Sequence, residues 1–142
     1  MSFILEGNET PLLLEELPRE RRQMKKSTVR PAWSFWHLVA ALFGVAAVAL
    51  GAYGAHVFRP NNEDFEKVFE TANKYHMYHN LLLAVAPYTR RPNIVGFLAM
   101  AGIISFCGSC YLSAVTENKS VSFPYAPIGG FCFMGAWAAL AF

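Results

Sequence analysis

The chain has 142 residues, a length that suits one domain, and it is 54% hydrophobic but only 15% charged. Soluble domains contain about 25% charged residues, so this composition excludes an ordinary soluble domain and predicts a membrane protein. The net charge of +2 is small, and the aromatic residues lie in apolar runs rather than between basic residues, which excludes a nucleic-acid-binding protein.

Residues 1–32 are polar and carry charges of both signs. Pro11, Pro18 and Pro31 prevent one long helix, so we expect an N-terminal arm outside the membrane. The leucines within residues 12–17 have three interpretations: chance leucines in a disordered tail, a peptide that docks on a neighbouring subunit, or an acidic dileucine sorting signal. The acidic residues of the arm argue against a mitochondrial transit peptide. We expect no cleaved targeting segment.

The first predicted membrane span covers residues 33–56, which contain no Lys, Arg, Asp or Glu. At about 1.5 Å per residue, a helix of this length crosses a hydrocarbon core of about 30 Å. Trp33 and Trp36 are expected to be its interfacial anchors. Small residues recur along it at intervals of three and four, which predicts a helix face that lets another backbone approach closely. These residues are Ala40, Gly44, Ala47, Gly51 and Gly54.

The second predicted span, residues 65–87, is amphipathic at its start and apolar at its end. One predicted face carries Phe65, Val68, Phe69, Ala72, His76, His79 and Leu83. The other is predicted to carry Glu66, Lys67, Glu70, Thr71, Asn73 and Lys74. Because these charges do not suit lipid, we expect the helix to lie outside the bilayer or along its interface at first, to enter near Tyr75 and to stop at Pro87.

The third predicted span, residues 94–115, contains no charged residue. Four small residues spaced by four predict a second packing face, namely Ala101, Ser105, Ser109 and Ser113. Cys107 and Cys110 form a C-x-x-C pair inside this helix, where we interpret them as small buried apolar residues rather than a redox or metal pair.

The last predicted span, residues 126–142, contains Gly129 and Gly130, which are expected to permit close helix contact. The sequence therefore predicts an all-α membrane protein with two parts. Residues 1–32 are the polar arm, and residues 33–142 are a compact bundle of four transmembrane helices.

Four sequence elements carry a resemblance to a known family: Gly51–His56, Tyr75–Leu81, Phe106–Tyr111 and Ile128–Trp137. Together they resemble the domain-of-unknown-function 423 family of small, transmembrane protein 256-like membrane proteins. The resemblance extends from about Trp36 to the C-terminus. It implies a compact four-helix membrane protein and brings no established activity. Eukaryotic members are associated with mitochondria, so the resemblance implies the inner mitochondrial membrane if the source is eukaryotic.

Three histidines are the candidates for chemistry. His76 and His79 lie three residues apart on one predicted helix face, and His56 precedes them across a short turn, so the three imidazoles have the ligand types of a zinc or copper site. A haem or quinone pocket or a proton relay is a further reading. The alternative we favour is structural: the histidines bond to nearby tyrosines, Asn80 or backbone carbonyls and join the first two helices. We therefore expect no metal and no cofactor.

The chain has no Ser-His-acid order, no phosphate-binding loop and no paired acidic residues at membrane depth, so we do not expect an enzyme. We expect a structural or accessory subunit of a larger membrane complex, such as a respiratory complex, with lipid and other subunits as its partners. The alternative is a small transporter, channel or cofactor-binding protein that uses His56, His76 and His79.

The basic residues predict an orientation in the membrane. Eight of the twelve Lys and Arg residues lie in the arm and in the loop 88–93. By the positive-inside rule we expect the N-terminus, this loop and the C-terminus on one side, which in mitochondria is the matrix.

Overall fold

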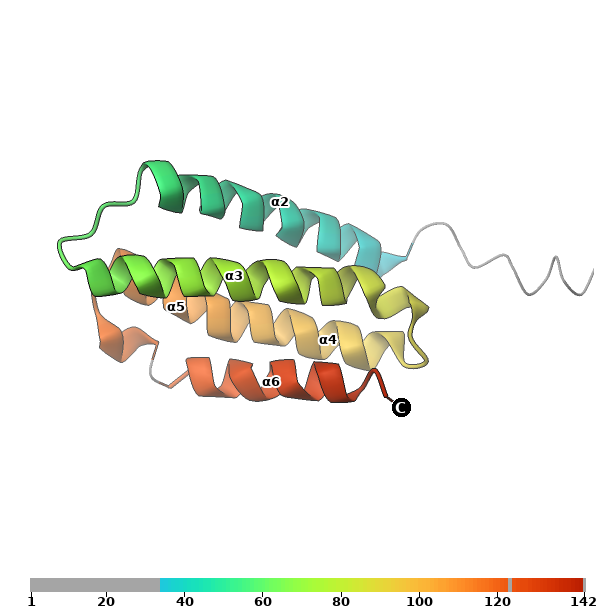
Figure 1. Cartoon of the computed structure of the whole chain (residues 1–142). Coiled ribbons are helices and arrows are strands. Elements are labelled where there is room, and N and C mark those ends of the chain that lie inside the picture. The colour runs from blue at the N-terminus through green and yellow to red at the C-terminus, as the bar shows by residue number, and fades with distance from the viewer. Residues whose placement is uncertain (1–33, 123, 142) are drawn as a thin grey trace, which may run out of the picture. The chain divides into compact units, whose positions relative to one another are not determined.

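The computed structural model describes residues 34–122 and 124–141, which belong to one compact unit. This part of the chain contains helices and turns but no β-strand, which confirms the all-α prediction (Figure 1). The predicted N-terminal arm, with its leucines, and Trp33 lie outside the described residues.

Helix α2 (Phe35–His56) begins after the extended Ser34 and is 22 residues long. Trp36, expected at the membrane interface, is instead 2% exposed. Its indole nitrogen donates to Asn93 Oδ1 at 3.1 Å, and its ring packs where a side chain on Gly96 would otherwise lie. Trp36 therefore joins α2 to the helix that begins at residue 92, because the glycine leaves room for the ring.

Helix α3 (Glu63–Val85) begins two residues earlier than predicted, because the Asn62 side chain accepts a hydrogen bond from the Asp64 amide at 2.8 Å and caps it. Acidic residues in the first turn also favour a helix start at this point. The helix gives way to the 3-10 turn η1 (Ala86–Tyr88), which contains Pro87.

The third predicted span consists of three consecutive elements: α4 (Pro92–Gly102), a π-helical turn η2 (Ile103–Cys107) and α5 (Gly108–Val115). The sequence did not predict the π-helical turn. An α-helix has 3.6 residues per turn, so side chains spaced by four residues move gradually around its axis. A π-helical turn contains more residues and brings the next side chain back to the same side. Buried residues consequently stay on one side through the turn, at Val95, Ala99, Ile103 and Cys107.

Helix α6 (Ala126–Ala138) is shorter than the predicted span of 126–142. It follows the 3-10 turn η3 (Lys119–Val121). Its 13 residues extend about 20 Å, which is less than the hydrocarbon core of about 30 Å. In the described part of the chain, only α2 and the continuous segment Pro92–Val115 are long and apolar enough to cross a membrane by length and composition.

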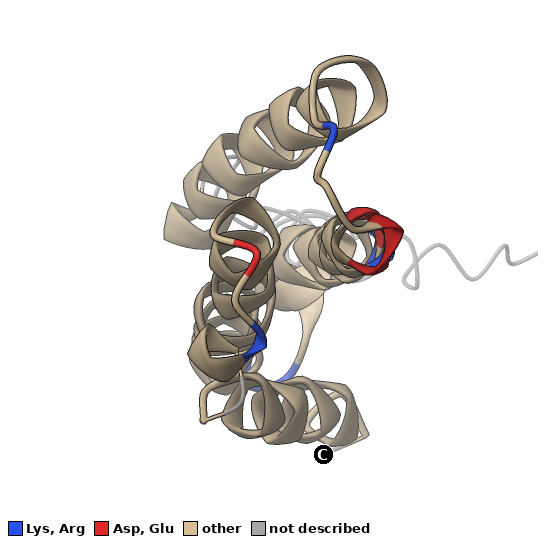
Figure 2. Cartoon of the chain, turned by 90° about the vertical axis from the view of Figure 1, so that its left-hand side faces the viewer, with Lys and Arg blue, Asp and Glu red and all other residues tan. Residues whose placement is uncertain are grey.

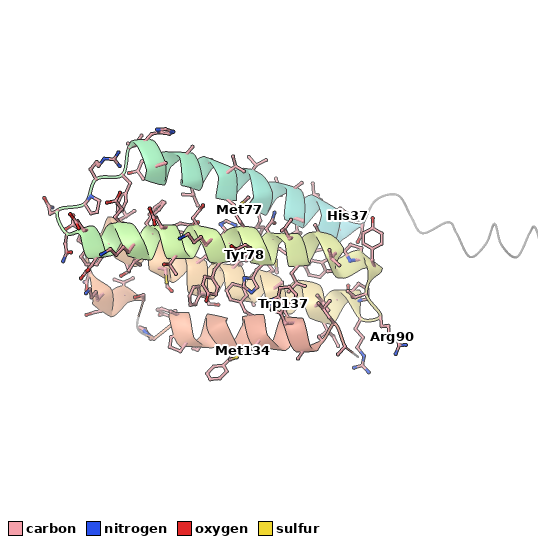
Figure 3. All side chains as sticks on the ribbon, in the orientation of Figure 1. His37, Met77, Tyr78, Arg90, Met134 and Trp137 are labelled. Atoms are coloured by element: carbon pink, nitrogen blue, oxygen red, sulfur yellow. The ribbon has the colours of Figure 1, made fainter. Side chains whose placement is uncertain are left out.

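Helix α3 packs against α2, α4 and α5, while α6 packs on α4 and the π-helical turn (Figure 1). Successive long segments run in opposite directions. The start of α2, the connection that carries Arg90, and the end of α6 therefore lie at one end of the unit (Figure 3). We call this the Arg90 end.

The opposite end, which we call the Glu117 end, carries the charges of the α2–α3 turn, the first turns of α3 and the loop after α5 (Figure 2). Glu117 Oε1 accepts hydrogen bonds from the backbone and side-chain nitrogens of Asn61, and Lys119 pairs with Asp64 at 3.3 Å. These contacts connect the two loops at the Glu117 end.

Candidate functional site

The predicted small-residue face of α2 packs against α3. A side chain on Gly51 would approach Asn73 Oδ1 to 3.0 Å, and one on Gly44 would approach Asn80 Nδ2 to 2.8 Å. A side chain on Gly54 would approach the ring of Phe69 to 2.7 Å. The glycines therefore leave space on α2 for two amide side chains and one ring of α3.

Asn73 connects three helices. Its Nδ2 donates to the backbone oxygen of Ala47 in α2 at 2.8 Å and to the hydroxyl of Tyr111 in α5 at 3.1 Å. The prediction that placed Asn73 on the charged face was wrong. Asn73 lies three residues before the buried His76, at the edge of the buried face, and the missing side chain of Gly51 lets its amide turn inward.

His76 lies deeper in the same interface and is 4% exposed. Its Nδ1 is 3.5 Å from the Tyr111 hydroxyl, and its ring packs edge-on against Phe43 of α2. Two buried atoms here, His76 Nε2 and Asn80 Oδ1, form no hydrogen bond with the described residues. We call Asn73, His76, Asn80 and Tyr111 the polar seam.

His79 faces α6 rather than α2. Its Nδ1 lies 2.8 Å from the backbone oxygen of Tyr75, its Nε2 accepts from Trp137 Nε1 at 3.2 Å, and its ring stacks on Phe133. The expectation that His79 joins the first two helices is therefore wrong, because α6 supplies both its hydrogen-bond donor and its stacking partner. Beside this contact lies an aromatic groove of about 540 Å³, which Gly130 also lines.

The three histidines do not meet. His56 lies exposed in the last turn of α2, whereas His76 and His79 are buried and face different helices. Within residues 34–122 and 124–141, no three His, Cys, Asp or Glu side chains lie close enough together to hold a metal ion. His37 lies near the Arg90 end, where its ring contacts Tyr88.

The remaining predicted packing residues lie near the π-helical turn. Ser105 donates to the Ala101 carbonyl and Ser109 donates to the Phe106 carbonyl, so both hydroxyls bond within their own helical segment. A side chain on Gly129 would collide with the backbone of Phe106, whereas one on Gly130 would meet none of the described atoms. Gly129 thus permits close contact with the turn, and Gly130 makes no such contact.

Comparison with known proteins places this arrangement in a family. The family model described as protein of unknown function (DUF423) matches residues 50–130. The chain belongs to the DUF423 family. This confirms the resemblance seen in the sequence, and the matched residues include the whole polar seam but not Trp137.

The DUF423 chain is also similar to several curated membrane proteins. It is 37% identical over 109 residues to UPF0382 membrane protein SAB0533 of Staphylococcus aureus, covering 72% of this chain and 88% of the relative. It is 34% identical over 108 residues to UPF0382 membrane protein YwdK of Bacillus subtilis, covering 70% and 87%. It is 31% identical over 116 residues to UPF0382 membrane protein C1782.12c of Schizosaccharomyces pombe, covering 75% and 98%. No solved structure matches the chain. These relatives and the apolar helices identify a membrane protein.

Proposed function

We propose that this DUF423 protein crosses the membrane with four helical segments and acts as a non-catalytic accessory subunit of a larger membrane complex. The position of the exposed charges on α3 carries the proposal. Asn73 touches Ala47, so Glu70 and Lys74, on either side of Asn73, lie beside the second half of α2 rather than beyond its end. Both are exposed. Charges at this depth do not face hydrocarbon, so they require a polar surface from a partner or from water.

The short α6 supports the same proposal. Because its 13 residues do not cover a full bilayer core, one end of α4–α5 extends past it. Exposed apolar side chains there include Leu112 and Val115. A neighbouring subunit that covers α5 and the charged side of α3 accounts for both features, with lipid on the outer side of α2.

The exposed side of α2 is suited to lipid. Large apolar side chains on it are more than half exposed at Leu38, Leu42, Val45 and Val48. In a eukaryotic cell we place the protein in the inner mitochondrial membrane, with the Arg90 end and both termini on the matrix side. The basic residues of the arm and of the loop 88–93 support this orientation.

The alternative of a transporter, channel or cofactor-binding protein depended on a cluster of His56, His76 and His79. That cluster does not form among the described residues, which removes the feature on which the alternative rested. Purification from the native membrane separates the two functions.

The test is purification of the tagged full chain from its native membrane in mild detergent. We expect other subunits to copurify at a fixed stoichiometry. Glu70→Lys should release them, whereas Glu63→Lys should not, because Glu63 is an exposed residue of the same helix that lies before the part beside Asn73. An isolated oligomer with no other subunit, or equal behaviour of the two variants, would contradict the proposal.

A further inference from the structure

The polar seam contains two buried polar groups that lie one helical turn apart on α3 and lack partners among the described residues. They are His76 Nε2 and Asn80 Oδ1. Residues four apart lie on the same helix face, so both groups belong to the side of α3 that packs on α2. Buried polar groups without partners are costly, and ordered water commonly satisfies them.

The hydrogen-bond directions in the seam determine what kind of ligand suits these two groups. Asn73 Nδ2 is a donor, so the Tyr111 oxygen accepts from it and the Tyr111 hydrogen is free to donate. His76 Nδ1 lies beside that hydroxyl, at 3.5 Å. A neutral imidazole that accepts at Nδ1 carries its hydrogen on Nε2.

We propose that the Tyr111 hydroxyl donates to His76 Nδ1, which leaves the hydrogen of His76 on Nε2, and that the α2–α3 interface binds one water molecule, or another hydroxyl group of similar size. This ligand accepts from His76 Nε2 and donates to Asn80 Oδ1. The ligand completes a chain of hydrogen bonds from the backbone of Ala47 through Asn73, Tyr111 and His76 to Asn80. The two protein partners are within the two to four that a buried water usually has.

This binding site is independent of the accessory-subunit role, since it concerns only residues inside the unit. It also assigns a role to His76 that differs from metal binding. A hydrogen on Nε2 leaves no lone pair there for a metal, while Nδ1 is directed at the Tyr111 hydroxyl.

Nuclear magnetic resonance of the full chain in lipid nanodiscs, with ¹⁵N-labelled histidine, tests the proposal. His76→Gln identifies the His76 signals by their loss. We expect long-range ¹H–¹⁵N correlation to show the hydrogen on Nε2, and magnetisation to pass from water to that hydrogen by cross-relaxation. A hydrogen on Nδ1 would overturn the proposal. So would a transfer that occurs only by proton exchange, or an Nε2 hydrogen that shows no contact with water.

Two variants with a matched control extend the test. Asn80→Leu should abolish the cross-relaxation with water, whereas retention of the wild-type signal would overturn the assignment of Asn80 as the second partner. Tyr111→Phe removes the donor to Nδ1 and should give a mixture of the two tautomers. Tyr125→Phe, at an exposed tyrosine, should leave the tautomer unchanged. The wild-type measurement stands alone if a variant fails to fold.

Discussion

The side-chain amide of Asn73 donates to the backbone oxygen of Ala47 at 2.8 Å, which fixes the alignment of α3 along α2. The same amide also donates to Tyr111 at 3.1 Å and so connects α2, α3 and α5. This contact places the charged turns of α3 beside an apolar helix.

Replacing Asn73 should test the importance of this connection. Asn73→Leu leaves the partly buried Tyr111 hydroxyl without its donor, at an expected cost of about 1 to 3 kcal/mol in the free energy of unfolding. Thr71→Leu, at an exposed position two residues earlier, should change it by less than about 0.5 kcal/mol. Unfolding by SDS in mixed micelles measures both variants. Equal effects would show that the Asn73 contacts do not stabilise the fold.

The consecutive glycines of α6 provide a matched pair. Gly129→Ala forces the new methyl group against the backbone of Phe106, which cannot move aside easily, and should destabilise the protein by about 1 to 3 kcal/mol. Gly130→Ala adds its methyl group in open space and should cost nothing or stabilise the helix slightly. If the two variants have the same melting temperature in detergent, the close contact of α6 with the π-helical turn is wrong.

A double-mutant cycle tests whether Gly51 is there to accommodate Asn73. A methyl group on Gly51 approaches Asn73 Oδ1 to 3.0 Å, so the amide must shift. The effect of Gly51→Ala on the free energy of unfolding should therefore be more favourable in the Asn73→Ala background than in the wild-type chain, by about 0.5 kcal/mol or more. Ala52→Val, at an exposed neighbouring position, should show no coupling to Asn73. Additive effects at Gly51 would contradict the proposed relation.

The sequence was sufficient to predict the long helices, because the apolar runs and the turn residues around Pro60 and Pro92 are local signals. It also identified the small-residue face of α2. The π-helical turn was not predicted, since a single wider turn leaves no distinct pattern in a uniformly apolar segment. The length of α6 was overestimated for a related reason: residues 139–142 are apolar and provide no stop signal.

The candidate site was predicted less well than the fold. Periodicity correctly placed His76 and His79 on the buried side of α3, but it does not reveal which helix each residue faces. His79 contacts Trp137, which is 58 residues away in sequence. The buried contacts of Asn73 were not predicted, because the neighbouring Glu70 and Lys74 are charged and led us to assign Asn73 to the same polar face. The spacing of the glycines on α2 could have indicated this contact, since Gly51 leaves room for a polar side chain on the partner helix.

We propose that the chain crosses the membrane several times, with the Arg90 end and the Glu117 end on opposite sides. The most direct test labels single cysteines in sealed vesicles, after Cys107, Cys110 and Cys132 are replaced by alanine. Arg90→Cys and Lys119→Cys each place one thiol in an exposed position at one end. A membrane-impermeant maleimide should label one of these from outside and the other only after the vesicles are opened. Labelling of both from the same side of intact vesicles would contradict the account.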